Sequence, residues 1–428
     1  MRLSNSLLFL SLYLPIRTSK AADRADNVTH DESWSFLVMA DIHTFTPFSF
    51  NPDTTKLGTV WKESIKILKS VKKEYGGELV MMPGDSNSYG PLTNQQIVER
   101  LGISGYTTEQ SIYEAGLNCY KAVRQLFRKA GYGTLLATVG DHELGGNEGF
   151  VISGGRSKLP TVPAYRKAFG RGYNKYAGGG YRYNEPIGKI KLRPLGTTYE
   201  DTSFAYRHNN ALFVTVDAFK LMDDGNSNYI DRTKGFGGEG AITCDVSGDH
   251  LDWFESVLVE ARNDTSIKHI FVQAHLPIIQ PVRKVSCSGQ FMDGADQSQF
   301  WVIMDKYDVD IYFAGEVHSN TASKSNDPAS NLVQIVSGHK DFSNFLVINM
   351  TDDVIDVKLF NEVGNKKVWN GQYVANGHLT IDKSSSAGID ISSSGELRLI
   401  DTVSALIKFD FQEMLPLGSR QVSALQAH

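Results

Sequence analysis

The chain has 428 residues, of which 41% are hydrophobic and 21% charged, a composition typical of a globular protein with a large core. The formal net charge of -5 at pH 7 gives no reason to expect specific binding to nucleic acid. No segment reaches the roughly 20 consecutive apolar residues that a membrane-spanning helix needs. Composition therefore points away from nucleic-acid-binding proteins and from proteins embedded in a membrane.

The amino-terminal segment has the pattern of a secretory signal peptide. Arg2 supplies a positive charge, residues 7–14 form an apolar run, and Ser19 and Ala21 are small residues at the two positions that signal peptidase reads. We expect residues 1–21 to be removed and the mature protein to be secreted or to remain in the secretory pathway.

Sequons and cysteines are compatible with export. Asn-x-Ser/Thr triplets begin at Asn27, Asn263 and Asn349, so the protein is expected to be a glycoprotein. Three cysteines allow one disulfide and one free thiol. We expect Cys244 to pair with Cys287, because both lie in Gly- and Ser-rich loops.

Five short apolar runs rich in β-forming residues predict strands that are buried on both faces. They cover residues 36–40, 79–82, 135–139, 270–274 and 311–314. Helical patterns of apolar residues lie between them, over residues 61–71, 123–127 and 251–261. Strands that alternate with helices predict an α/β fold, in which ligands bind beyond the carboxyl ends of the strands.

Two segments interrupt this alternation within a main domain predicted over residues 31–375. Residues 144–210 form an insertion rich in Gly and Tyr, and ten Lys and Arg residues fall between positions 156 and 193. They predict either an electropositive rim that gathers anionic substrate or an ordinary solvated loop. The interleaved tyrosines, including Tyr173, offer rings on which a base or sugar could stack. The Ser-rich segment 376–428 is expected to be a small added element or an extension.

Residues that bind metals follow each predicted strand directly. In chain order they are Asp41 and His43, then Asp85, then Asp141, His142 and Glu143, then His275, and finally Glu316 and His318. Carboxylates and imidazoles suit Zn, Mn and Fe. Five such clusters at successive strand ends predict a site for two cations, in which one carboxylate is shared.

In order and placement, these residues resemble the calcineurin-like metallophosphoesterases, a superfamily that includes the purple acid phosphatases. The pattern of that superfamily runs D-x-H, G-D, G-N-H-D/E, a lone H and G-H-x-H, and the resemblance covers residues 35 to about 345. It implies an α/β fold of two packed mixed β-sheets flanked by helices. It also implies hydrolysis of a phosphate ester by metal-activated water, without a covalent intermediate.

The resemblance implies a role for each residue. The first metal would be held by Asp41, His43 and His318, the second by Asp141, His275 and Glu316, with Asp85 bridging the two. His142 would act beside the phosphoryl group as a general acid or hydrogen-bond donor, and Glu143 would orient that region. His339 and Lys340 follow another apolar run and are candidates for contact with phosphate, although a strand-end turn explains them equally well.

Two residues depart from the superfamily pattern. Asp141 stands where the pattern has Asn, and Glu316 stands where it has the first His of G-H-x-H. Both remain oxygen donors, but four carboxylates then face two cations. We therefore expect two divalent or trivalent ions, with Mn, Fe, Mg or Ca favoured and Zn still able to bind.

The predicted partner is a small anionic phosphate ester, and the sequence leaves open whether it is a monoester or a diester. The alternative is an exported, non-catalytic protein that binds metal or phosphate through a degenerate phosphoesterase site. His142, which is intact, favours the enzyme.

Overall fold

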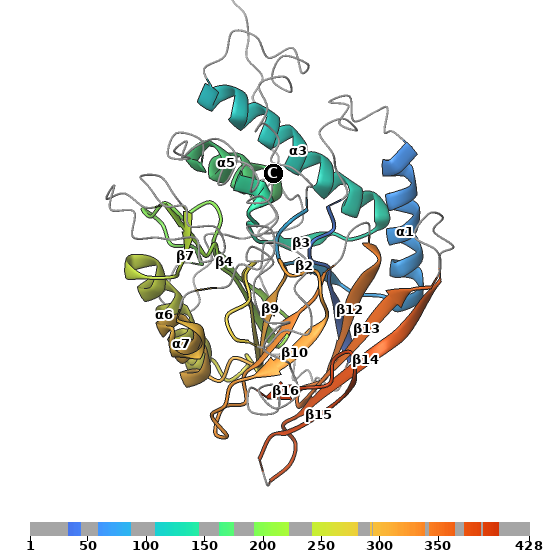
Figure 1. Ribbon diagram of the computed structural model, residues 1–428, viewed down its shortest axis with the longest axis vertical. Helices are drawn as coiled ribbons and strands as arrows, with labels where there is room; N and C mark the ends of the chain where they lie inside the picture. Colours follow the sequence, from blue (N-terminus) through green and yellow to red (C-terminus); the bar gives the residue numbers. More distant parts are fainter. Residues whose placement is uncertain are drawn as a thin grey trace, which may run out of the picture. The chain divides into compact units, whose positions relative to one another are not determined.

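The computed structural model describes residues 33–43, 59–86, 108–144, 162–174, 192–221, 242–280, 292, 294–338, 342–363, 372–386 and 388–401 (Figure 1). Residues 32–428 form one compact unit by their contacts. The predicted signal peptide lies outside the described residues. Cys287, His339 and Lys340 lie outside them as well. No helix among the described ranges is long and apolar enough to cross a membrane.

The first sheet has seven strands in the order β15-β14-β13-β12-β1-β2-β3. Its parallel part consists of β1 (Trp34–Val38), β2 (Leu79–Met82) and β3 (Thr134–Ala137). Its antiparallel part consists of β12 (Asn344–Met350), β13 (Val354–Glu362), β14 (Tyr373–Asp382) and β15 (Asp390–Gly395). The sheet is therefore mixed, and β1 lies where the two parts meet.

The second sheet also has seven strands and follows the order β16-β10-β11-β9-β8-β5-β4. Its members are β4 (Phe204–His208), β5 (Ala211–Thr215), β8 (His269–Gln273), β9 (Ile311–Ala314), β10 (Thr321–Lys324), β11 (Val333–Val336) and β16 (Ile400–Asp401). Strands β5, β8, β9 and β11 are parallel, whereas β4 and β10 run antiparallel to their neighbours. A separate pair joins β6 (Phe219–Leu221) to β7 (Ile242–Cys244).

Aromatic side chains fill the space between the two sheets. Phe36 on β1 lies 5.1 Å from Phe213 on β5 and 5.0 Å from Phe271 on β8, measured between ring centroids. The alternate residue Leu37 points to the other core, which the helices cover. Because β1 is buried on both faces, its sequence is a continuous apolar run rather than an alternating one. This arrangement confirms the predicted α/β fold of two packed mixed sheets flanked by helices.

Helices cover the outer faces of the sandwich. The helices α1 (Thr59–Tyr75) and α3 (Thr108–Ala130) pack on the first sheet, and the shorter α5 (Val162–Phe169) packs against α3. The helices α6 (Gly248–Asn263) and α7 (Gln299–Lys306) lie on the second sheet (Figure 1). The buried residues of α1 include Leu68 and Val71, which belong to the stripe that the sequence predicts. Apolar residues at helical spacing thus mark the packing faces, as expected.

The carboxyl-terminal part described by the structure belongs to both sheets. The predicted boundary at residue 375 falls inside β14, and the Ser-rich residues 392–394 lie in β15, the edge strand of the first sheet. An edge strand with exposed side chains needs few apolar residues, which explains its composition. Strand β16 then joins the second sheet. Between β15 and β16, the carboxylate of Glu396 accepts hydrogen bonds from Asn320, Asn361 and Asn376.

Candidate metal centre

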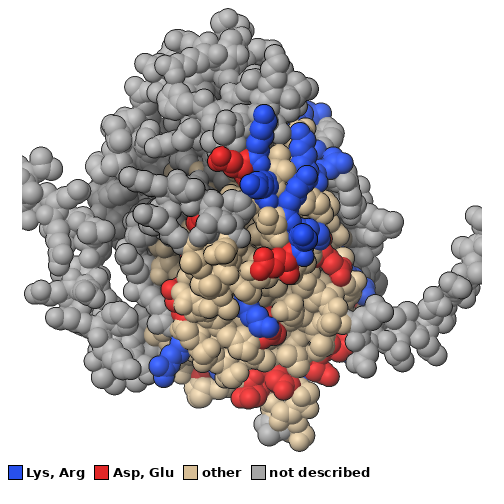
Figure 2. Space-filling model, turned by 90° about the vertical axis from the view of Figure 1, so that its right-hand side faces the viewer, with Lys and Arg blue, Asp and Glu red and all other residues tan. Residues whose placement is uncertain are grey.

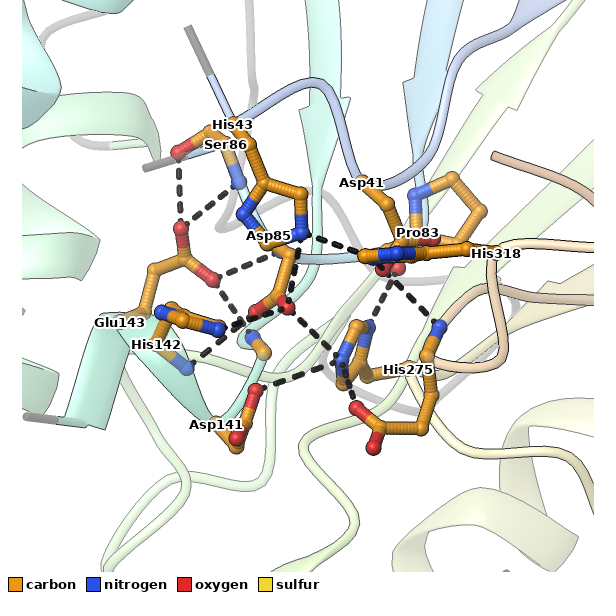
Figure 3. A network of polar contacts seen from close by, with 12 residues as sticks. Asp41, His43, Pro83, Asp85, Ser86, Asp141, His142, Glu143, His275 and His318 are labelled. Carbon is orange, nitrogen blue, oxygen red and sulfur yellow. Dashed lines mark hydrogen bonds and ion pairs between the residues drawn. The ribbon is translucent and has the colours of Figure 1, made fainter. Parts of the chain in front are cut away.

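The candidate metal-binding residues lie in loops directly after the carboxyl ends of five strands, where both sheets present the same edge (Figure 3). Strands β1, β2 and β3 of the first sheet lead to Asp41 and His43, to Asp85, and to Asp141. Strands β8 and β9 of the second sheet lead to His275, and to Glu316 and His318. The fold therefore brings together side chains that are up to 277 positions apart, as the parallel strands predict.

The backbone of these loops is unusual. Nine described residues other than glycine have a positive φ angle, and five of them are candidate ligands: Asp41, His43, Asp85, Glu316 and His318, with φ between 42° and 67°. Side chains of L-residues rarely adopt this left-handed region, and residues held there cost free energy that the surrounding structure must offset. Such strain is common at functional sites. Here the left-handed backbone conformation accompanies five side chains whose donor atoms lie close together.

A first group of donors consists of Asp41, His43 and His318, which offer one donor atom each within 4.8 Å of one another. The Nε2 atoms of the two histidines lie 2.9 Å apart, and Nε2 of His318 lies 3.6 Å from Oδ1 of Asp41. That same oxygen accepts a hydrogen bond from the backbone N–H of Glu316. The loops after β1 and β9 thus hold each other in place.

A second group consists of four fully buried residues, Asp85, Asp141, His275 and Glu316. The Nδ1–H of His275 donates to the carbonyl oxygen of Pro83 at 2.8 Å, because a carbonyl can only accept. Its Nε2 atom therefore faces the carboxylates, 3.1 Å from Oε2 of Glu316 and 3.7 Å from Oδ1 of Asp141. A histidine fixed in this way through its other nitrogen is typical of metal ligands.

Asp85 lies between the two groups. Its Oδ2 atom is 3.6 Å from Nε2 of His43 and 3.4 Å from Nε2 of His275, which belong to different groups. The same oxygen lies 3.7 Å from Nε2 of His142. Asp85 is thus placed where a shared carboxylate would have to be.

The residues present fit a pair of cations. Among the described residues, no hydrogen-bond partner is found for Oδ2 of Asp41, Oδ2 of Asp85 or either side-chain oxygen of Asp141, although all are buried. Leaving a buried carboxylate oxygen without a partner is costly in free energy. The donor set contains carboxylates and imidazoles and no thiolate, which suits cations that prefer oxygen and nitrogen.

Crowded carboxylates shift the proton affinities of the centre. Burial, followed by the charge of Asp141, raises the pKa of Glu316 to about 8. Burial opposes a charge on His275, but the carboxylates around it, Asp85 foremost, raise its pKa well above the ordinary value. Burial likewise opposes ionisation of Asp85, yet the positive histidines hold the pKa of its carboxyl well below its usual range. Without cations, the centre takes up protons that metal binding would release.

This proton uptake predicts how the stability of the metal-free protein depends on pH. Burial raises the pKa of Glu143 to about 7 and that of Glu316 to about 8, so the folded chain holds protons that unfolding releases. Their contribution to stability is complete below about pH 4.5 and is lost as the pH rises through 7 and 8. Burial lowers the pKa values of His43 and His250, which act in the opposite direction only below about pH 6.5. Chelator-treated protein should therefore lose about 2 °C or more in Tm between pH 6.5 and 8.

The matched control for this pH effect is the Glu316→Gln variant, which removes one of the two titrating carboxyls. Its Tm should change less over the same interval, and metal-loaded wild-type protein should also show a flatter profile because cations replace the protons. A Tm of the metal-free protein that rises from pH 6.5 to 8 would contradict the assignment of the pH effect to Glu143 and Glu316.

Glu143 fastens the loops that carry the second group of donors. Its Oε2 atom accepts hydrogen bonds from the backbone N–H groups of Gly140 and Asp85, at 2.8 and 2.9 Å. Its Oε1 atom accepts from the backbone N–H and the hydroxyl of Ser86, at 2.9 and 2.8 Å. Both carboxylate oxygens of Glu143 are thus engaged by the backbone of Gly140, Asp85 and Ser86 and by the Ser86 hydroxyl.

Two tyrosines that the sequence did not single out for this role support Glu143. The hydroxyl of Tyr173, in the π-helical turn η3 (Gly170–Asn174), lies 2.6 Å from Oγ of Ser86. The hydroxyl of Tyr120 on α3 donates to the backbone carbonyl of Glu143 at 2.7 Å. Tyr173 is fully buried, so its prediction as a stacking surface for a base or sugar is wrong. Its place in a Gly- and Tyr-rich insertion gave no sign of the contact with Ser86.

The Tyr173→Phe variant is expected to lower the free energy of unfolding by about 1 kcal/mol and to weaken turnover modestly, because Ser86 loses a buried hydrogen-bond partner. The matched control is Tyr132→Phe, since the buried hydroxyl of Tyr132 has no partner among the described residues. Chemical denaturation of both variants would measure the difference. Equal losses in the two variants would show that the Tyr173 hydroxyl has no particular role.

Only part of the insertion predicted as either an electropositive rim or a solvated loop lies among the described residues, and there one of its ten basic residues can be assigned a structural role. Arg166, on α5, is buried, and its Nε donates to Oδ2 of Asp217 at 2.8 Å, so it is a structural residue and no part of such a rim. Among the described residues, exposed lysines gather along α1, where the blue patch of Figure 2 lies. They are Lys62, Lys66, Lys69 and Lys73, whose spacing places them on one face of the helix.

Comparisons with known proteins give matches among solved structures alone. No protein-family model matches the sequence, and no curated protein matches it. PhoD is 13% identical, with a TM-score of 0.47 over 92% of this chain and 78% of that one. A purple acid phosphatase from seeds of yellow lupin (Lupinus luteus) is 10% identical, with a TM-score of 0.44 over 82% of this chain and 54% of the lupin enzyme. GAP50, the anchor in the inner membrane complex of Plasmodium, is 13% identical, with a TM-score of 0.41 over 80% and 88% of the two chains.

The two mixed sheets and the residues at the ends of five strands are the features on which a resemblance of this chain to a known class rests. Carboxylates and imidazoles follow β1, β2, β3, β8 and β9 in the order that the superfamily pattern prescribes. The chain thus resembles the calcineurin-like metallophosphoesterases in its architecture and in the order of its site residues. It differs from their pattern at Asp141 and Glu316, which both lie in the second group of donors.

Proposed function

We propose that the protein is a metal-dependent hydrolase of small anionic phosphate esters, with two cations in its centre. The observation that carries the proposal is the position of Asp85, whose Oδ2 atom lies within 3.7 Å of histidines from both donor groups and of His142. One cation would be held by Asp41, His43 and His318, and the other by Asp141, His275 and Glu316. When bound, such a pair lowers the pKa of a water molecule and neutralises charge on a phosphoryl group.

His142 is placed to act on the substrate. It begins the short helix η2 (His142–Leu144), and its backbone N–H donates to Oδ1 of Asp85 at 3.2 Å, which fixes its position relative to the shared carboxylate. Its side chain is 17% exposed, whereas that of Asp85 is 1% exposed. This exposure supports a position of His142 on the side from which a substrate would arrive. There it would donate a hydrogen bond to a phosphoryl oxygen or a proton to the leaving oxygen.

The direct test is hydrolysis of aryl phosphate monoesters and diesters by metal-stripped protein, with Mn, Fe, Mg, Ca and Zn added back separately. Turnover should return with at least one metal, and His142→Ala should reduce it by about 100-fold or more while leaving the metal content unchanged. The matched control is His378→Ala, because His378 lies on β14 and contacts Asp356, remote from the strand-end loops.

The second candidate function is a non-catalytic protein that binds metal or phosphate. The exchanges at Asp141 and Glu316 are the observation that favours it, since they depart from the superfamily pattern. Folded protein that holds two metals per chain, yet hydrolyses neither a monoester nor a diester, would establish this alternative and overturn the hydrolase.

Export remains part of the proposal. The signal-like pattern of residues 1–21 supports it, together with the sequons at Asn263 and Asn349. Amino-terminal sequencing of the mature protein from its native cells tests the cleavage, and an uncut amino terminus would contradict it.

A further inference from the structure

We propose that helix α1 carries a docking surface for a linear sulfated polysaccharide, separate from the metal centre. This surface is the lysine row, which consists of Lys62, Lys66, Lys69 and Lys73. The inference does not depend on turnover at the metal centre. The choice of a polysaccharide rests on the export that forms part of the proposed function.

The lysine row is straight and runs along one side of α1. At 3.6 residues per turn, its four side chains leave the helix within an arc of about 60°, and the row extends over about 16 Å. The acidic residues Glu63 and Glu74 leave the same helix about 90° or more from the centre of that arc. The row therefore presents a line of positive charges to solvent, each about one helical turn from the next (Figure 2).

The charges of the row are not compensated within the described part of the chain. All four lysines are exposed, and no ion pair or hydrogen bond joins any of them to another described residue. Lys72, which points away from the row, instead donates to the carbonyl oxygen of Gly77 and lies over the ring of Tyr132. Like charges three or four positions apart destabilise a helix. The row thus lowers the stability of α1 without an internal contact that offsets the loss.

A shallow hollow of about 410 Å³ lies along the row. Its described lining consists of the four lysines together with Ile65 and Ser70. Ile65 is half-buried, whereas the hydroxyl of Ser70 can donate a hydrogen bond to an anionic oxygen. A hollow in which four of six described side chains end in ammonium groups suits a ligand with repeated negative charges.

The composition of this surface favours a polyanion over a protein or a membrane. Protein interfaces are centred on aromatic and arginine anchors and are depleted of lysine. A helix that binds a membrane buries its apolar face in the lipid, but the apolar residues of α1, such as Leu68 and Val71, are packed in the protein core. No large hydrophobic side chain described on α1 is exposed. Contact through charge is what remains.

Lysine suits a chain of repeated sulfate groups. Its ammonium group is a compact point charge without the fixed fork of arginine, so a row of lysines can contact regularly placed anions without a single register. Clusters of basic residues bind heparin or nucleic acids. The proposed export would bring the protein to the compartment in which sulfated polysaccharides occur. Because the formal net charge of the chain is -5, attraction of a polyanion depends on this local surface.

The experiment measures the binding of heparin to the purified full-length protein by isothermal titration calorimetry at several salt concentrations. Wild-type affinity should fall as the salt concentration rises. Lys66→Gln/Lys69→Gln should weaken binding at least about tenfold and flatten the dependence on salt. The matched control is Lys268→Gln/Lys306→Gln, which removes two exposed lysines outside the row and should retain wild-type affinity.

Thermal denaturation separates loss of binding from loss of folding. Lys66→Gln/Lys69→Gln should unfold at the same temperature as the wild type or at a higher one, because it relieves repulsion along the helix. Lys62→Gln/Lys73→Gln is a second variant that neutralises the ends of the row and should also weaken heparin binding. Hydrolysis of aryl phosphates should be unchanged in both, since the row contributes no donor to the metal centre.

Four outcomes would overturn the inference. They are the absence of heparin binding by folded wild-type protein, an equal loss of affinity in the row variant and in the matched control, and equal binding of heparin and its desulfated form. The fourth is binding to phosphatidylserine vesicles or to single-stranded DNA without binding to heparin, which would assign the row to a different partner. Failure of the proposed hydrolase would leave all four readouts unchanged, because none of them measures turnover.

Discussion

Replacing Asp85 with Asn is expected to reduce kcat/KM for phosphate esters by more than about 100-fold and to lower metal occupancy below two ions per chain. The Oδ2 atom of Asp85 lies between His43 and His275, so the substitution removes the one charge that faces both donor groups. The asparagine amide offers one neutral carbonyl oxygen, and its NH2 group cannot bind a cation, so a charged oxygen can no longer be shared by two cations. Elemental analysis and single-substrate kinetics measure the two effects.

The control for Asp85 is Asp356→Asn, which removes a partly buried carboxylate from β13 instead of from the strand-end loops. Asp356 pairs with Lys358 and His378 and contacts none of the candidate ligands through any described interaction. This variant should retain two metals and nearly full turnover. An Asp85→Asn protein with two metals and wild-type kinetics would contradict the shared role.

The Gly140→Ala variant is expected to lose metal-dependent turnover and to be destabilised by about 1–3 kcal/mol. A Cβ atom at this position would lie 2.1 Å from Oδ1 of Asp85 and 2.8 Å from Oε2 of Glu143. Neither side chain can withdraw easily, because Glu143 is held by Gly140, Asp85 and Ser86 and fastens the loop. Thermal denaturation and metal analysis would measure the two losses.

Gly133→Ala provides the matched control, since Gly133 lies just before β3 whereas Gly140 lies just after it. A Cβ atom at Gly133 would meet no other atom within 4 Å. The substitution should leave metal content unchanged and stability the same or slightly higher, because alanine reduces the freedom of the unfolded chain. If both alanine variants kept full metal content and stability, the close packing around Asp85 would not be what maintains the centre.

The parts of the fold that sequence patterns predicted are those that are buried on both faces. The runs at 79–82 and 311–314 coincide with β2 and β9, and the other three runs match the bounds of β1, β3 and β8 within one or two residues. These strands are continuous apolar segments followed directly by polar residues, so the strand and its end are both visible in the sequence. For the same reason, the residues that gather at the centre could be predicted before their distances were known.

Other features left no such signal. The contact between Tyr173 and Ser86 joins residues 87 positions apart, and neither side chain belongs to a periodic pattern. Strand β15 has the sequence DISSSG, whose exposed serines are equally compatible with a loop. Arg166 could not be distinguished from solvated basic residues, because its partner Asp217 lies on a different part of the chain. Long-range pairs of polar residues are decided by the tertiary fold.

The hydrogen bonds of Glu396 have a consequence for how far the chain can be shortened. The carboxylate of Glu396 accepts hydrogen bonds from Asn361 and Asn376 of the first sheet and from Asn320 in the loop before β10 of the second. The neighbouring residue Leu397 is fully buried between the sheets. A protein ending at residue 375 would lose this junction and would expose the ladder edges of β13 and β10 at once. Exposed edges pair with other chains, so such a protein should aggregate. Residues 376–401, the described part of the serine-rich segment, thus join the two sheets, and we expect them to keep in alignment the loops between which metals would bind.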